Sequence, residues 1–112
     1  MQHKIAKYLF DINESILSIE NYLGTKINYN EYLKNKILRR AVERELEIIG
    51  EALNNLKKLD KTISISYYKQ IISLRNKIIH SYDNIDNTTI WGIVIKHLPV
   101  LKTEIQHLIN TK

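Results

Sequence analysis

Apolar residues recur along most of this chain at intervals of three and four, the spacing of one face of an α-helix. In the first segment they advance by 4, 3, 4, 3 and 4 residues, through Ile5, Leu9, Ile12, Ile16, Ile19 and Leu23. Gly24 follows directly, where a helix end favours a residue with left-handed backbone. The pattern predicts a helix over about Lys4–Leu23.

A second, longer helix is predicted over about Glu31–Lys58, after a polar link in which Asn28 or Asn30 can act as the N-cap. Gly50 lies inside this helix at a cost of about 1 kcal/mol relative to alanine, so we expect another helix to approach closely there. The apolar positions come in pairs and form a stripe wide enough to touch two neighbours: Ile37, Leu38, Ala41, Val42, Ile48, Ile49, Ala52, Leu53, Leu56 and Leu59.

A third helix is predicted through Tyr68–Tyr82, with Ser64 or Ser66 as its N-cap. The β-branched residues at 62–66 tempt a strand assignment, but the segment is short and has no partner strand. A fourth helix is expected to begin at Asp86 or Asn87. Pro99 should kink it, because proline removes one backbone hydrogen bond. Its apolar face comprises Trp91, Val94, Leu98, Leu101, Ile105 and Leu108.

These four amphipathic segments and their short links predict an all-α fold, a four-helix up-and-down bundle. Three glycines and one proline leave little room for the turns of an all-β fold. The length of 112 residues fits a single helical domain, 1–112. The wide stripe of the second helix leaves apolar surface that one bundle does not cover, which favours a dimer.

Composition narrows the function classes. The absence of cysteine excludes disulfides and thiolate metal sites and favours a reducing cytoplasm. No apolar run approaches the length of a membrane span, and the N-terminus lacks the apolar core of a signal peptide. We therefore expect a cytoplasmic protein with no membrane partner. A net charge of +5 permits a polyanionic partner but also fits a lysine-rich solvated surface.

Most of the residues that could take part in catalysis lie within Ser73–Asp83. Arg75 is a permanent cation whose fork of donors suits a phosphate, His80 can exchange a proton near neutral pH, and Tyr82 adds a hydroxyl. Residues five apart on one helix differ by about 140°, so Arg75 and His80 do not share a face. Their convergence needs a helix break or a second subunit.

Asn76 shares a face with His80, and Tyr82 shares one with Arg75. A ribonuclease without a metal needs a proton acceptor for the 2′-hydroxyl, a proton donor for the departing oxygen and a cation for the charged phosphorane. His80 suits the first two roles, Arg75 the third, and Asn76 can orient His80 or the phosphate. Tyr82 can bind RNA through its hydroxyl or ring.

Structural interpretations compete with these roles. Arg75 can simply pair with Glu47 or Glu51, which would then buttress it, and His80 can be a helix-end residue favoured by the dipole. Tyr82 can be a core aromatic, as Trp91 is expected to be. The glutamates at positions 43, 45, 47 and 51 fit a solvated or ion-paired face. The remaining histidines have no second ligand at metal spacing, so we expect surface or helix-end positions and no metal site: His3, His97 and His107.

The segment Arg75–Tyr82, with its Arg-x4-His-x-Tyr pattern, resembles the signature of the HEPN superfamily, and more closely that of the HepT-like toxins. Upstream, Arg40–Ala52 is similar to the second-helix motif of that family. Downstream, Trp91, Ile93, Val94 and the run 98–102 are similar to its last helix. The resemblance covers the chain from about Ala6 to Ile109.

The resemblance implies a HEPN-like bundle and an endoribonuclease toxin with Arg75 and His80 as catalytic residues in a composite cleft at a two-fold dimer interface. It implies RNA as substrate, no cofactor, and an MntA-like nucleotidyltransferase antitoxin that transfers AMP to Tyr82. Two alternatives remain open: a catalytically silent helical partner that presents substrate to a nucleotidyltransferase, and a structural helical dimer without chemistry.

Overall fold

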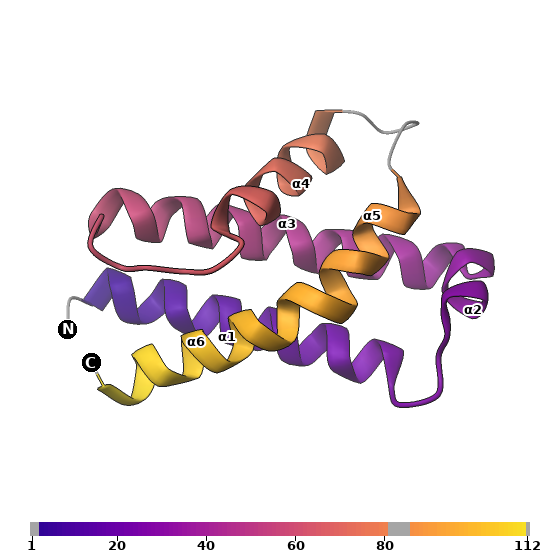
Figure 1. Cartoon of the computed structure of the whole chain (residues 1–112), viewed down its shortest axis with the longest axis horizontal. Helices are drawn as coiled ribbons and strands as arrows, with labels where there is room; N and C mark the ends of the chain where they lie inside the picture. The colour runs from indigo at the N-terminus through magenta and orange to yellow at the C-terminus, as the bar shows by residue number, and fades with distance from the viewer. Residues whose placement is uncertain (1–2, 81–85, 112) are drawn as a thin grey trace.

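The computed structural model describes residues 3–80 and 86–111, and within these ranges all regular elements are helical. They are α1 (His3–Leu23), α2 (Tyr29–Lys34), α3 (Lys36–Leu59), α4 (Tyr68–His80), α5 (Asn87–Gly92), the π-helix η1 (Ile93–His97) and α6 (Leu98–Thr111). The last three follow one another without a gap and form one long helical rod. With α1, α3 and α4 this rod makes the predicted all-α bundle, to which α2 is a short addition (Figure 1).

The arrangement places α1 and α3 side by side and antiparallel, with α6 packed across α1 and α4 across α3 (Figure 1). Helix α1 has the bounds that its apolar spacing predicts, to within one residue, and all six residues of the predicted stripe are buried. Gly24 ends the helix with φ of +62°, a left-handed conformation that glycine adopts without a Cβ clash.

The prediction of one continuous helix over Glu31–Lys58 is wrong, because Asn35 interrupts it. Asn35 has an extended backbone, and its N–H donates to the Tyr32 carbonyl, which closes α2. Its side-chain oxygen accepts a hydrogen bond from the Leu38 N–H at 3.0 Å and caps α3. Asparagine competes for backbone groups in this way, so it ends one helix and starts the next. The N-cap of α2 is Asn28, one of the two predicted candidates.

The close approach predicted at Gly50 is present, and the neighbour is Arg75 on α4. A Cβ built on Gly50 would lie 2.4 Å from the Arg75 Cβ, far inside van der Waals contact. The crossing of α3 and α4 therefore depends on a residue without a side chain. This crossing fixes the helix that carries Arg75 and His80.

Residues 60–67 form an irregular connection to α4 without a strand, as expected. Ile63 and Ile65 are buried and anchor the segment to the core. The predicted serine caps are wrong, since the backbone N–H and hydroxyl of Ser66 both donate to Glu104 of α6. The Tyr67 carbonyl instead accepts the first bond of α4, from the Ile71 N–H, with Tyr67 itself at φ of +61°.

The C-terminal rod begins at Asp86, whose side chain accepts a hydrogen bond from the Thr88 N–H as predicted for an N-cap. Near Pro99, where the sequence predicts a kink, the rod contains the π-helix η1, which ends two residues before the proline. In it the Leu98 N–H reaches back to the Ile93 carbonyl. Proline has no N–H, so a turn that precedes it is already short of one helical hydrogen bond.

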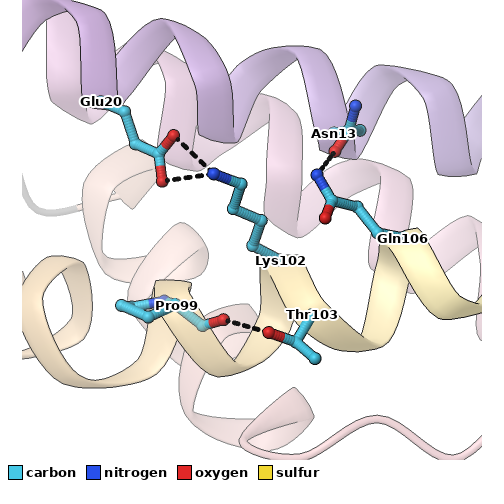
Figure 2. A network of polar contacts seen from close by, with 6 residues as sticks. All are labelled: Asn13, Glu20, Pro99, Lys102, Thr103 and Gln106. Atoms are coloured by element: carbon cyan, nitrogen blue, oxygen red, sulfur yellow. Dashed lines mark hydrogen bonds and ion pairs between the residues drawn. The ribbon is translucent and has the colours of Figure 1, made fainter.

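Beyond Pro99 the rod returns to regular α-helix and meets α1 through polar contacts (Figure 2). Lys102 forms an ion pair with Glu20 at 3.0 Å, and the Gln106 amide donates to the Asn13 oxygen at 3.5 Å. Under these contacts Leu101 and Ile105 are completely buried. Helix α6 is thus bound to α1.

Candidate active site

Arg75 lies in the middle of α4 with its side chain turned toward α3, and only 14% of that side chain is exposed. Its Nη1 atom is 3.3 Å from the Glu51 Oε2 atom, an ion pair between α4 and α3. Its Nε atom is buried and has no hydrogen-bond partner within the described residues. The guanidinium is therefore held by packing on Gly50 and by a single carboxylate, with donors left unused.

Glu51 thus occupies the buttressing position considered for it, whereas Glu47 does not. The Glu47 carboxylate pairs with Arg44 at 3.1 Å on the same helix. The spacing in the sequence did not show which of the two glutamates pairs with Arg75, because both lie near the α3–α4 crossing. The structure places Glu51 beside Arg75 and leaves Glu47 to an exposed pair of helix neighbours.

Glu43 is ion-paired, one of the two states expected for the glutamate face, but it is also buried. This residue is only 5% exposed, and its carboxylate accepts a hydrogen bond from Arg40 at 3.0 Å. Tyr32 lies close by with its hydroxyl fully buried. Burial, reinforced by the nearby Glu43 charge, raises the pKa of the Tyr32 phenol well above its ordinary value. The phenol therefore stays neutral at physiological pH.

His80 is the last residue of α4 and is exposed, as is Asn76 one turn earlier. The predicted shared face of these two residues is therefore open to solvent. Arg75, in contrast, points into the α3–α4 contact, so one protomer does not bring Arg75 and His80 into one cleft. Tyr82 lies outside the described residues.

A cleft of about 270 Å³ lies beside this cluster, between α1 and α3, with Ile79 of α4 at its edge. Its polar lining includes three carboxylates, from Asp11, Glu47 and Glu51, against the single cation of Arg44. Such a lining repels phosphates. This cleft therefore does not suit an RNA strand, although it adjoins Glu51.

A second hollow, of about 520 Å³, lies between α4 and the α5–η1 segment. We call it the basic groove and define it by Lys69, Leu74, Lys77, Ile93, Lys96 and His97. The sequence pattern did not predict this groove. A signal was present on one side, because Lys69, Ser73 and Lys77 recur every four residues on α4, but its opposite wall depends on how the C-terminal rod folds back.

His97 is the last residue of η1, one of the helix-end positions expected for it, and it is partly buried. Its ring stacks on Tyr67 with 4.0 Å between ring centroids and an interplanar angle of 17°. Trp91, expected in the core, is partly buried and packs on Tyr29 and Tyr32.

Within residues 3–80 and 86–111, no group of three or more His, Cys, Asp or Glu side chains is placed to hold a metal ion. In the same ranges no helix combines the length and the apolar character needed to cross a membrane.

The model of the family described as "Ribonuclease HepT-like" matches residues 12–108, which include α4 and the ion pair between Arg75 and Glu51. The chain belongs to the HepT-like ribonuclease family. The resemblance drawn from the Arg-x4-His-x-Tyr pattern and its flanking motifs is thereby confirmed. No solved structure gave a significant match to the chain.

Named relatives agree with HepT-like membership over nearly their whole length. A "Putative RNase" of Methanocaldococcus jannaschii is 40% identical over 105 residues, which cover 91% of this chain and 94% of the relative. A "Probable ribonuclease HepT" of Thermococcus cleftensis is 34% identical over 112 residues, 96% of this chain and 98% of the relative. A "Putative RNase" of Caldanaerobacter subterraneus is 34% identical over 100 residues, 88% of each chain.

Proposed function

We propose that this protein is a metal-independent endoribonuclease that acts as the cytoplasmic toxin of a toxin–antitoxin pair. The observation that carries the proposal is the match to the HepT-like ribonuclease family over 12–108, a range that contains both Arg75 and His80. The names of the relatives, which include RNases and a ribonuclease HepT, support the same class of activity.

The reaction uses the nucleophile that RNA itself carries. The 2′-oxygen attacks the adjacent phosphorus as a base removes its proton, and the bond from phosphorus to the 5′-oxygen breaks as that oxygen takes a proton. The products are a 2′,3′-cyclic phosphate and a 5′-hydroxyl. His80 is exposed at the end of α4 and serves as base or acid. Arg75 neutralises the phosphorane charge.

The positions of these two side chains support a composite site. Arg75 faces α3 while His80 faces solvent, so we assign the working pair to two protomers that meet near the end of α4. A two-fold axis there brings two copies of each residue to one cleft. Asn76, exposed one turn before His80, is then placed to orient the imidazole or the phosphate.

In this proposal a phosphate of the RNA displaces the Glu51 carboxylate from Arg75. Glu51 is 58% exposed, so its carboxylate can rotate into water when a phosphate oxygen takes over Arg75. The guanidinium does not need to move, because Gly50 and the α3–α4 packing hold its stem. Such preorganisation lowers the cost of binding charge in the transition state.

The decisive experiment is cleavage of a single-stranded RNA by His80→Ala. We expect the rate to fall roughly 100-fold or more, because a general acid–base group is lost, and cleavage by the wild type to persist in EDTA. His107→Ala is the matched control, since His107 is an exposed histidine on α6. Wild-type rates in a folded His80→Ala protein, or activity that requires added magnesium, would contradict the mechanism.

We further propose that Tyr82 is the acceptor of AMP from an MntA-like nucleotidyltransferase antitoxin. The sequence supports this through the spacing, because Tyr82 is two residues from His80 and seven from Arg75. An attached AMP group brings a phosphate that Arg75 can bind in place of RNA. The modification would inactivate the toxin by occupying its site.

Intact mass measures this directly, after incubation with the antitoxin, ATP and magnesium. Wild-type protein should gain one or more AMP units and lose ribonuclease activity, whereas Tyr82→Phe should gain none and stay active. Tyr29→Phe is a suitable control, as a tyrosine whose hydroxyl is hydrogen-bonded to Thr88. Equal labelling of wild type and Tyr82→Phe would refute the assignment.

A second candidate function is a catalytically silent helical partner of a nucleotidyltransferase. The specific observation in its favour is the state of Arg75, which is mostly buried and ion-paired as a structural arginine would be. The His80→Ala experiment separates the two functions, because a silent partner has no RNA cleavage for the substitution to remove.

A further inference from the structure

The basic groove has a cationic rim that other side chains leave free. Lys69 and Lys77 stand on α4, and Lys96 faces them from η1. None of the three forms an ion pair within residues 3–80 and 86–111, in contrast to Lys7 and Lys102, which do. Three like charges around one hollow repel one another, and an anion between them would relieve that repulsion.

Among the residues that the structure describes, no carboxylate lines the groove. At the Thr89 wall the hydroxyl donates to the Asp86 carboxylate, so that carboxylate is already engaged. This distinguishes the groove from the cleft beside Glu51, which carries three carboxylates. Of these two hollows, the basic groove is thus the one that suits a phosphate.

The floor of the groove is apolar, formed by Leu74 of α4 and Ile93 of η1. His97 closes one end, its ring held by the stack on Tyr67. A cationic rim above an apolar floor matches a nucleotide chain, with phosphates at the rim and base faces below. The two lysines of α4 are eight residues apart, about 12 Å along the helix, which favours a run of phosphates over a single one.

The groove also leads toward the proposed reaction centre. Lys77 precedes His80 by one helical turn, and His80 ends α4. The rim lysine Lys77 is therefore close along α4 to the proposed acid–base residue.

We propose that the basic groove binds the single-stranded RNA substrate next to the scissile phosphate, through Lys69, Lys77 and Lys96. This assignment rests on the proposed ribonuclease function and adds a binding subsite outside the Arg75 and His80 pair. The lysines contact phosphates, so they contribute affinity without base preference.

The test measures binding of a fluorescent single-stranded RNA by anisotropy, over a range of salt concentrations. The probe binds to protein that carries His80→Ala, so that it stays intact. Replacing Lys69, Lys77 and Lys96 together by Gln should weaken binding roughly tenfold or more. The slope of log affinity against log salt should fall by about 2, since each lost phosphate contact on a single strand removes about 0.7.

A matched control removes the same charge elsewhere, with Gln at Lys4, Lys26 and Lys36, all exposed and outside the groove. The control should bind within about twofold of the parent, and Arg at the three groove positions should restore binding because the charge is kept. An equal loss in the control, or an unchanged salt slope in the groove variant, overturns the proposal. Displacement of the RNA by polyglutamate as readily as by unlabelled RNA also overturns it, in favour of an acidic protein partner.

The measurements distinguish a wrong assignment of the groove from a wrong assignment of the ribonuclease function. Wild type that cleaves RNA, with unchanged KM in the groove variant, overturns the groove alone. Wild type that binds RNA through the three lysines but never cleaves it overturns the ribonuclease function and leaves the groove in place. Protein that neither binds nor cleaves RNA overturns both.

Discussion

At the residue scale, Gly50 sets how closely α4 approaches α3 and hence where Arg75 is held. A Cβ at position 50 would lie 2.4 Å from the Arg75 Cβ and 2.6 Å from its Cγ. The Arg75 Cβ is fixed by the backbone of α4, so it cannot rotate away as a side-chain tip can. A methyl group there must push the two helices apart.

Gly50→Ala should therefore destabilise the fold by about 1–3 kcal/mol, despite the better helix propensity of alanine. Gly92→Ala is the matched control. Gly92 is also helical, but a Cβ there meets nothing within 4 Å, and this variant should be stabilised by about 0.5–1 kcal/mol. Urea unfolding measures both. A neutral or stabilising Gly50→Ala would mean that α4 does not cross α3 as described.

What the sequence revealed at this scale was the need for a neighbour at Gly50, because glycine in a helix interior carries a known cost. It did not reveal that the neighbour is Arg75. That contact joins residues 25 positions apart, and the helical spacing of either segment says nothing of which residues of the other it meets. For the same reason, helical spacing did not show whether Glu47 or Glu51 pairs with Arg75.

At the scale of elements, local spacing predicted α1 almost to the residue because its stripe has no rival interpretation. The break at Asn35 was missed, since asparagine can sit in a helix or cap one, and the choice depends on how Tyr32 packs in the core. The basic groove was missed for a related reason, because its two walls lie far apart in sequence.

Asp86, the N-cap of α5, makes the stability of this helix depend on pH. The Thr89 hydroxyl and the Thr88 N–H donate to the Asp86 carboxylate and hold its pKa below the ordinary value. Because the pKa of Asp86 is lower in the folded state, the hydrogen bonds to its carboxylate stabilise the protein above the unfolded pKa of about 3.9. We call this the contribution of the N-cap to stability. It is lost as pH falls through the folded pKa.

Asp86→Asn should remove this pH dependence, because asparagine accepts the same hydrogen bonds without titrating. Melting temperatures of wild type and Asp86→Asn from pH 2.5 to 7 provide the measurement, and we expect the advantage of wild type to vanish toward the acid end. Asn28→Asp places the same chemistry at the N-cap of α2 and should introduce a similar dependence. A constant difference across this range would contradict the assignment.

At the scale of the whole molecule, the bundle is thin. It measures 42 × 30 × 19 Å, and the shortest extent is about two helix diameters. Most helices therefore keep one face toward the outside. Among the described residues, the three most exposed large apolar side chains are those of Ile37 at 84%, Phe10 at 59% and Ile95 at 50%. The apolar surface expected on the second predicted helix is present at Ile37.

We predict a homodimer in solution, because the proposed chemistry needs Arg75 and His80 from different protomers. Light scattering should give twice the 13.2 kDa of one chain. The sharper measurement mixes two inactive variants, Arg75→Gln and His80→Ala. In a shared cleft the mixed dimer keeps one Arg75 and one His80, so part of the activity should return. A mixture as inactive as its components, despite confirmed subunit exchange, would refute the composite site.

The π-helical segment η1 accommodates one more residue between two buried positions than a regular α-helix would. Ile90 and Leu98 are both buried although they are eight residues apart, a separation that leaves them about 80° out of line on a regular α-helix. The wide turn of η1 absorbs that surplus. A chain that lacked exposed Lys96 would place the two residues seven apart, the ordinary spacing of one helix face. The rod is therefore one residue longer than its inner face needs, and that extra residue contributes one of the three lysines of the basic groove.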